Sequence, residues 1–217
     1  MKKILPIDDL INIYKKGFFP MAESKQSNKV IFYKPKKRFI IPINEFHVPK
    51  KLFRLFKKSQ YIFKINFDFE RVIFNCQNTN RKSNGTWINN IILDTYIQLF
   101  KANKCHSVEC YDRNNLVGGL YGLQIGGCFF GESMFSMRSN TSKYCLLFLI
   151  AILKKNSFNI LDSQFYNSHL TQFGAYEIET ENYMQKLKKS IEKKCNFKSL
   201  KNFQEALSLI HPTSHKS

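Results

Sequence analysis

The chain has 217 residues, of which 43% are hydrophobic and 15% aromatic, and this composition excludes an intrinsically disordered protein. It carries 34 Lys and Arg against 16 Asp and Glu, a formal net charge of +18 at pH 7. The basic residues gather at 34–38, 50–58 and 186–201, which indicates a nucleic-acid partner, although an anionic membrane surface or a lysine-rich proteome would also explain the excess.

Six cysteines are present, and the sequence contains no Cys-x-x-Cys pair and no histidines at metal-ligand spacing from them. We therefore expect reduced thiols and no bound metal. The chain opens without a secretory signal, and no stretch approaches the ~18 consecutive apolar residues of a transmembrane helix. We expect a cytoplasmic protein without a membrane partner.

The first 40 residues are expected to form a small N-terminal module, followed by a main domain over residues 41–217. Within the module, residues 7–16 have the amphipathic spacing of a short helix that ends at Gly17. An apolar turn is expected at 18–21 and a short strand at 30–33. Arg38 closes a basic loop, and its planar guanidinium is suited to a phosphate, although a solvated loop explains it equally well.

The next segment alternates strands and helices. The apolar spacing predicts strands at 39–43 and 61–67 and helices at 49–58, 69–77 and 89–102. Gly85-Thr86-Trp87-Ile88 precedes the last of these helices and holds the only tryptophan. A lone tryptophan is more often part of the core, but this position could also line the mouth of a pocket.

The stretch 116–136 contains six of the nine glycines. Its period-two pattern predicts two strands joined by a tight turn at Gly126-Gly127. A helix is predicted at 143–155, a strand at 158–165, a short helix at 167–173 and a strand at 176–178. The residues alone therefore predict an α+β or mixed α/β fold.

Between Arg113 and Tyr176 the only acidic residues are Glu132 and Asp162, each in an apolar predicted strand. A buried carboxylate is costly unless it is paired or used in function. One interpretation is an internal ion pair with Lys143 or Arg138. The other is a shared cleft, because strand alternation would place Glu132 beside Met134 and Asp162 beside Gln164.

Four ordered motifs resemble the leucyl/phenylalanyl-tRNA–protein transferase family. They are Tyr14 followed by GFFPM at 17–21, GTWI at 85–88, VGGLYGLQIGGCFFGESMFS at 117–136 and LDSQFYNSHLTQFGA at 161–175. The resemblance implies an acetyltransferase-like main domain. It also implies transfer of Leu or Phe, and possibly Met, from aminoacyl-tRNA to proteins that begin with Lys or Arg, which marks them for N-terminal-rule degradation. The aminoacyl ester is already activated, so no cofactor is expected.

The resemblance also implies roles for individual residues. Asp162 and Gln164 would be catalytic. Our own hypothesis for their roles is that Asp162 polarises and orients Gln164, and that the side-chain carbonyl of Gln164 accepts a hydrogen bond from the attacking amine. Glu132 would bind the cationic N-terminal residue, and the segment that contains Met21 would hold the terminal adenosine of the tRNA. The other expected substrate contacts are Tyr14, Trp87, Asn167 and an apolar donor pocket formed by Leu120, Phe129, Met134, Leu146, Leu149, Leu153 and Leu161.

Two alternatives from other classes remain open. The first is an acyl-CoA-dependent N-acetyltransferase, which would share the fold; however, the stretch 138–142 lacks the glycines of a pyrophosphate-binding turn. The second is a non-catalytic RNA-binding module. It explains the basic blocks but gives no reason for Asp162 and Gln164 on an apolar strand.

Overall fold

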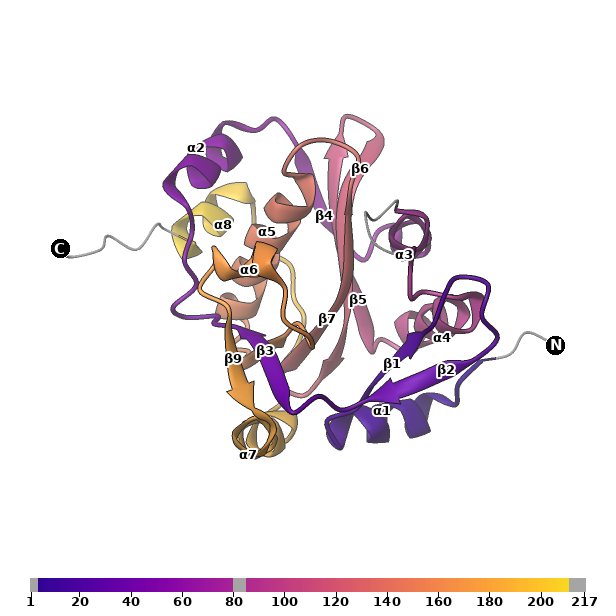
Figure 1. Ribbon diagram of the computed structural model, residues 1–217. Coiled ribbons are helices and arrows are strands. Elements are labelled where there is room, and N and C mark those ends of the chain that lie inside the picture. Colours follow the sequence, from indigo (N-terminus) through magenta and orange to yellow (C-terminus); the bar gives the residue numbers. More distant parts are fainter. Residues whose placement is uncertain (1–3, 80–84, 211–217) are drawn as a thin grey trace.

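The computed structural model describes residues 4–79 and 85–210, and its helices cover both faces of a mixed sheet (Figure 1). The helices are α1 (Ile7–Lys15), α2 (Lys50–Lys58), α3 (Phe69–Asn78), α4 (Asn90–Lys101), α5 (Thr141–Lys155), α6 (Ser168–Thr171), α7 (Thr180–Ile191) and α8 (Phe203–Leu209). The strands are β1 (Phe19–Ala22), β2 (Val30–Tyr33), β3 (Lys37–Ile41), β4 (Ile62–Ile65), β5 (Cys105–Asp112), β6 (Asn115–Ile125), β7 (Cys128–Ser136), β8 (Ile160–Asp162) and β9 (Tyr176–Glu179).

The main sheet has the strand order β4-β5-β6-β7-β8-β3-β9. Each neighbouring pair is antiparallel except β7 and β8, which are parallel and joined by the crossover helix α5. Gly126, with φ of 57°, and Gly127 make the turn between β6 and β7, as predicted. The prediction of a mixed α/β fold is confirmed.

Two apolar cores lie on opposite faces of this sheet. Helix α5 packs on one face, where Leu146, Leu149 and Leu153 are buried with Leu120 and Phe129 of the sheet. Helices α3 and α4 pack on the other face, with side chains such as those of Tyr121 and Phe130. In Figure 1, α5 and α8 are accordingly separated from α3 and α4 by the central strands.

Strands β7 and β8 stay paired for only three residues on each strand. The last pair joins Phe130 and Asp162, and beyond it the two strands separate. The predicted strand at 158–165 is therefore too long. Gln164 has φ of 63°, a left-handed conformation that cannot continue a strand. The split opens a space between β7 and β8 near the middle of the sheet.

The N-terminal segment forms its own two-stranded antiparallel sheet from β1 and β2. Residues 19–22 are thus a strand, and the prediction of a simple turn at 18–21 is wrong. Strand β3 begins at Lys37 and pairs with β8 and β9 of the main sheet, so it spans the expected boundary near residue 40. The division into two domains stays a prediction. No helix within residues 4–79 and 85–210 is long and apolar enough to cross a membrane.

Candidate active site

A cleft of about 360 Å³ occupies the space where β7 and β8 separate. Its walls come from residues 131–134 of β7, from residues 161–167 at the end of β8 and beyond it, from α5, and from Met21 of β1 and the nearby Trp87. The predicted site residues that line it are Met21, Trp87, Leu120, Glu132, Met134, Leu146, Leu149, Leu161, Asp162, Gln164 and Asn167. The fold therefore gathers predicted site residues as far apart in the sequence as Met21 and Asn167, a separation of 146 positions.

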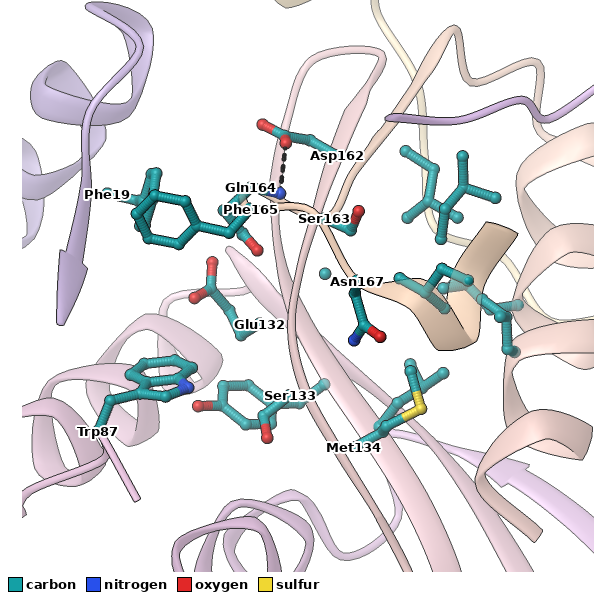
Figure 2. A pocket seen from close by; sticks show the side chains of 18 of the residues that line it. Phe19, Trp87, Glu132, Ser133, Met134, Asp162, Ser163, Gln164, Phe165 and Asn167 are labelled. Carbon is teal, nitrogen blue, oxygen red and sulfur yellow. Dashed lines mark hydrogen bonds between the residues drawn. The ribbon is translucent and has the colours of Figure 1, made fainter. Parts of the chain in front are cut away.

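A β-bulge in β7 separates the polar part of the cleft from its apolar part. Tyr121 of β6 pairs with Ser133 and Gly122 pairs with Gly131, so Glu132 is an extra residue between them. The prediction that Glu132 and Met134 share a face is therefore wrong, because the bulge shifts the alternation by one residue. Figure 2 shows Glu132 and Trp87 on one side of β7 and Met134 on the other.

Glu132 is buried beside two tyrosines. The Tyr14 hydroxyl of α1 donates to Glu132 Oε1 over 2.6 Å and also shares a short hydrogen bond with the Tyr96 hydroxyl of α4. Burial raises the pKa of Glu132 to about 8, although the bonds from the tyrosines act to lower it. Glu132 is therefore mostly protonated at neutral pH. Tyr96 was not predicted as a site residue, because a tyrosine at helical spacing is typical of a core.

Asp162 is fully buried and has several hydrogen-bond donors around its carboxylate. Arg38 Nε lies 3.0 and 2.9 Å from its two oxygens and Arg38 Nη2 lies 2.8 Å from Oδ2. The Tyr183 hydroxyl donates to Oδ2 over 2.6 Å, and the Gln164 backbone N–H donates to Oδ1 over 2.9 Å. The partner of Asp162 is thus Arg38, not Lys143 or Arg138.

The role expected for Arg38 also needs correction. Its side chain is buried, and its Nη1 donates to the Gly17 carbonyl over 2.8 Å. Burial alone would lower the pKa of Arg38, but Asp162 raises it above its ordinary value, so the guanidinium stays charged. A buried guanidinium held by Asp162 is not free to contact a tRNA phosphate.

Gln164 is held in place by its backbone. Its backbone N–H donates to Asp162 Oδ1, and its backbone carbonyl accepts from the Phe39 N–H over 3.0 Å. Together these bonds fix the left-handed conformation of Gln164. Asp162 thus orients Gln164 through the main chain and not through the side-chain amide, as the dashed line in Figure 2 marks. Among the described residues, buried Gln164 Nε2 has no hydrogen-bond partner, so the amide can serve a substrate.

The apolar part of the cleft faces α5. Leu120, Met134, Leu146, Leu149 and Leu161 line it. Phe129 and Leu153 were expected there too, but the structure places both fully in the core, where they do not line the cleft.

Met21 and Trp87 lie at the opposite end, where Trp87 is joined to β1 by the bond from Ala22 N–H to the Trp87 carbonyl, 3.0 Å long. Asn167 lines the cleft near α6 and caps that helix, because its Oδ1 accepts from the His169 N–H over 3.0 Å. The cleft is therefore lined by a partly exposed aromatic side chain at one end and by buried aliphatic side chains at the other. A substrate with an aromatic base and a buried aliphatic or aromatic group would match both ends.

In contrast to Arg38, the basic residues on helices α2 and α7 are exposed to solvent. They are the five lysines and arginines of α2 and the three lysines of α7. Within residues 4–79 and 85–210, no group of three or more His, Cys, Asp or Glu side chains is arranged to hold a metal ion.

Comparison with known proteins gives a consistent result. A family model described as leucyl/phenylalanyl-tRNA protein transferase matches residues 40–188. The chain is 40% identical to a protein of that name from Maricaulis maris over 89% of each chain. It is 42% identical to one from Paramagnetospirillum magneticum over 84% of this chain and 88% of the relative. It is 38% identical to one from Chlorobaculum tepidum over 89% of this chain and 100% of the relative.

Proposed function

Because this chain belongs to the leucyl/phenylalanyl-tRNA–protein transferase family, we propose that it moves leucine or phenylalanine from aminoacyl-tRNA to the α-amine of proteins that begin with Lys or Arg. It is an aminoacyltransferase. The observation that carries the proposal is the divided cleft: a buried carboxylate lies on one side of β7, an aliphatic pocket lies on the other, and Gln164 lines the same space.

The aminoacyl-tRNA would enter with its amino acid in the apolar part. Leu120, Met134 and Leu149 offer unbranched or γ-branched side chains that can accommodate Leu, Phe or Met. The terminal adenine would lie between Trp87 and Met21, with indole as the stronger stacking surface. Asn167, which lines the cleft beside α6, would contact the ribose or a phosphate.

The acceptor would bind on the carboxylate side. A Lys or Arg side chain that approaches Glu132 replaces water with a charge-assisted hydrogen bond, which favours the ionised carboxylate. Tyr14 and Tyr96 hold that carboxylate in position. A neutral N-terminal residue would leave Glu132 protonated and would gain no such bond.

In the reaction, the amine nitrogen forms a bond with the ester carbonyl carbon, and the bond from that carbon to the ribose oxygen breaks. The amine gives up a proton and the ribose oxygen takes one, so the step is balanced without a cofactor. An α-amine has a pKa of about 7.7–8.0, and therefore a useful fraction is neutral without a strong base. Gln164 aligns the amine through its side-chain amide, and the proton leaves through water or a ribose hydroxyl. Asp162 acts on this step only by positioning Gln164.

We also propose that the main domain has the acetyltransferase-like fold. The parallel pair β7 and β8, which separates next to the cleft, supports this assignment. We propose a cytoplasmic location, where charged tRNA is available. The division of the chain into an N-terminal module and an aminoacyl-transfer domain is likewise a proposal, supported by the separate β1–β2 sheet.

The test measures transfer of labelled leucine from Leu-tRNA to a peptide that begins with Arg and to the same peptide beginning with Ala. Wild type is compared with Gln164→Ala and with the control Gln172→Ala. Gln172 lies at the end of α6 and does not line the cleft. We expect transfer to the Arg peptide in wild type and Gln172→Ala, and a loss of about a hundredfold in kcat for Gln164→Ala.

Two results would overturn the proposal. Wild-type protein that binds Leu-tRNA but transfers nothing would favour the RNA-binding module. Transfer of an acetyl group from acetyl-CoA, without transfer from Leu-tRNA, would favour the N-acetyltransferase.

A further inference from the structure

Tyr183 of α7 is a buried residue outside the cleft, and it contacts the Asp162 carboxylate that binds the backbone of Gln164. Its side chain is only 1% exposed, and its hydroxyl donates to Asp162 Oδ2 over 2.6 Å. Burial and the neighbouring Asp162 raise the pKa of Tyr183 well above its ordinary value, so the hydroxyl keeps its proton and remains a donor. The hydrogen bond links the C-terminal helical segment to the centre of the sheet.

The ring of Tyr183 also contacts Arg38. The Arg38 guanidinium lies 4.8 Å from the Tyr183 ring centre and 4.6 Å from that of Phe19. Arg38, Asp162 and Tyr183 therefore form one buried cluster, which we call the clamp. Through the bond from Arg38 to the Gly17 carbonyl, the clamp also contacts the turn between α1 and β1.

The geometry divides the two oxygens of Asp162 between different tasks. Arg38 Nε contacts both oxygens, but only Oδ2 accepts from Tyr183 and lies 2.8 Å from Arg38 Nη2, whereas only Oδ1 accepts from the Gln164 N–H. A carboxylate can rotate about its terminal bond, which has a broad torsional preference. The Tyr183 hydroxyl resists this rotation and so keeps Oδ1 directed at Gln164.

We propose that Tyr183 is a positioning residue for the transfer reaction, which holds the Asp162 carboxylate in the orientation that fixes Gln164 in the cleft. This inference rests on the proposed aminoacyl transfer. Tyr183 touches neither substrate, because it does not line the cleft. Its removal should therefore slow the chemical step and leave substrate binding unchanged.

The test uses two variants that each remove one tyrosine hydroxyl from a buried carboxylate. Tyr183→Phe keeps the ring against Arg38 and removes the bond to Asp162. Tyr111→Phe removes the bond of 3.2 Å to Glu109, in a part of the sheet that does not line the cleft. Both are assayed for leucine transfer to an Arg peptide, with kcat and both KM values measured, at a temperature where circular dichroism shows each variant folded.

We expect kcat to fall about tenfold in Tyr183→Phe, with the KM for Leu-tRNA and for the peptide within about twofold of wild type, and no change in Tyr111→Phe. Active wild type with an unchanged kcat in Tyr183→Phe would overturn this inference alone. Equal losses in both variants, or a rise in KM with kcat unchanged, would overturn it as well. Inactive wild type would overturn the proposed function and this inference together.

Discussion

Arg38 and Asp162 form a buried ion pair between residues 124 positions apart, with Arg38 Nη2 2.8 Å from Asp162 Oδ2 and exposed fractions of 1% and 0%. Removing one member of such a pair leaves the other charge buried without compensation. Arg38→Met should therefore lower the free energy of unfolding by about 3–5 kcal/mol. Urea denaturation followed by circular dichroism would measure this change.

The matched control for Arg38 is Arg138→Met. Arg138 Nη2 lies 3.2 Å from Asp112, but these side chains are 57% and 36% exposed. Water screens this pair, so its loss should cost less than about 1 kcal/mol. Equal effects from the two substitutions would contradict the burial that the structure assigns to Arg38.

The selectivity for basic N-termini should depend on pH. Burial raises the pKa of Glu132 to about 8, and a cationic side chain binds the ionised form. The ratio of kcat/KM for an Arg peptide to that for an Ala peptide should therefore rise severalfold between about pH 6 and about pH 9. The two peptides share the same α-amine, so its titration largely cancels in the ratio. A flat ratio in wild type, or a rising one in Glu132→Gln, would refute this role.

The same raised pKa predicts an effect on stability. The folded state keeps the Glu132 proton at pH values where the unfolded chain has released it. The contribution of Glu132 to stability is therefore full below the ordinary carboxyl pKa of 4.5 and is lost as pH rises to about 8. The difference in free energy of unfolding between wild type and Glu132→Gln should shift in favour of the variant over this window. Urea denaturation of both proteins across the window would measure it.

Gly122 should not tolerate a side chain. A Cβ atom there would meet the Phe130 carbonyl oxygen and the Phe129 ring, closer than real Cβ atoms approach. Gly122→Ala should lower the free energy of unfolding by roughly 1–3 kcal/mol through overpacking. Gly131→Ala is the control, since its Cβ would lie 3.5 Å from the Asp162 carbonyl, an ordinary contact. A larger loss at Gly131 than at Gly122 in thermal unfolding would contradict the packing of the bulge.

The choice of donor should respond to the volume of the apolar part. Leu120 lines the cleft beside its strand partner Met134. Leu120→Phe would occupy space needed by a phenylalanine donor more than by leucine. We expect kcat/KM for Phe-tRNA to fall about tenfold or more relative to Leu-tRNA. Because both donors are measured with the same variant preparation, any loss of folded protein cancels in the ratio of their kcat/KM values. A ratio equal to that of wild type would mean that Leu120 does not contact the donor.

The sequence predicted the hairpin at 116–136 because Gly126 and Gly127 specify a tight turn through local backbone preference. Glycines inside these strands, such as Gly122 and Gly131, indicate a bulge or a close approach of another group. They did not place the bulge at Glu132, because its position depends on how β6 pairs with β7. The partnership of Arg38 with Asp162 was missed for a related reason: β3 inserts between β8 and β9, and this order is not encoded locally. Tyr96 and Tyr183 could not be distinguished from core aromatics before their hydroxyl partners were known.

The bulge has a consequence for how specificity can change. Because Glu132 and Met134 lie on opposite faces of β7, the proposed acceptor and donor sites are lined by different neighbours, tyrosines of α1 and α4 on one side and leucines of α5 on the other. Substitutions at positions without shared contacts usually have additive effects. The donor preference and the acceptor preference of the enzyme can therefore change independently, in evolution or by engineering. A substitution on one face of β7 should have little effect on the substrate bound at the other face.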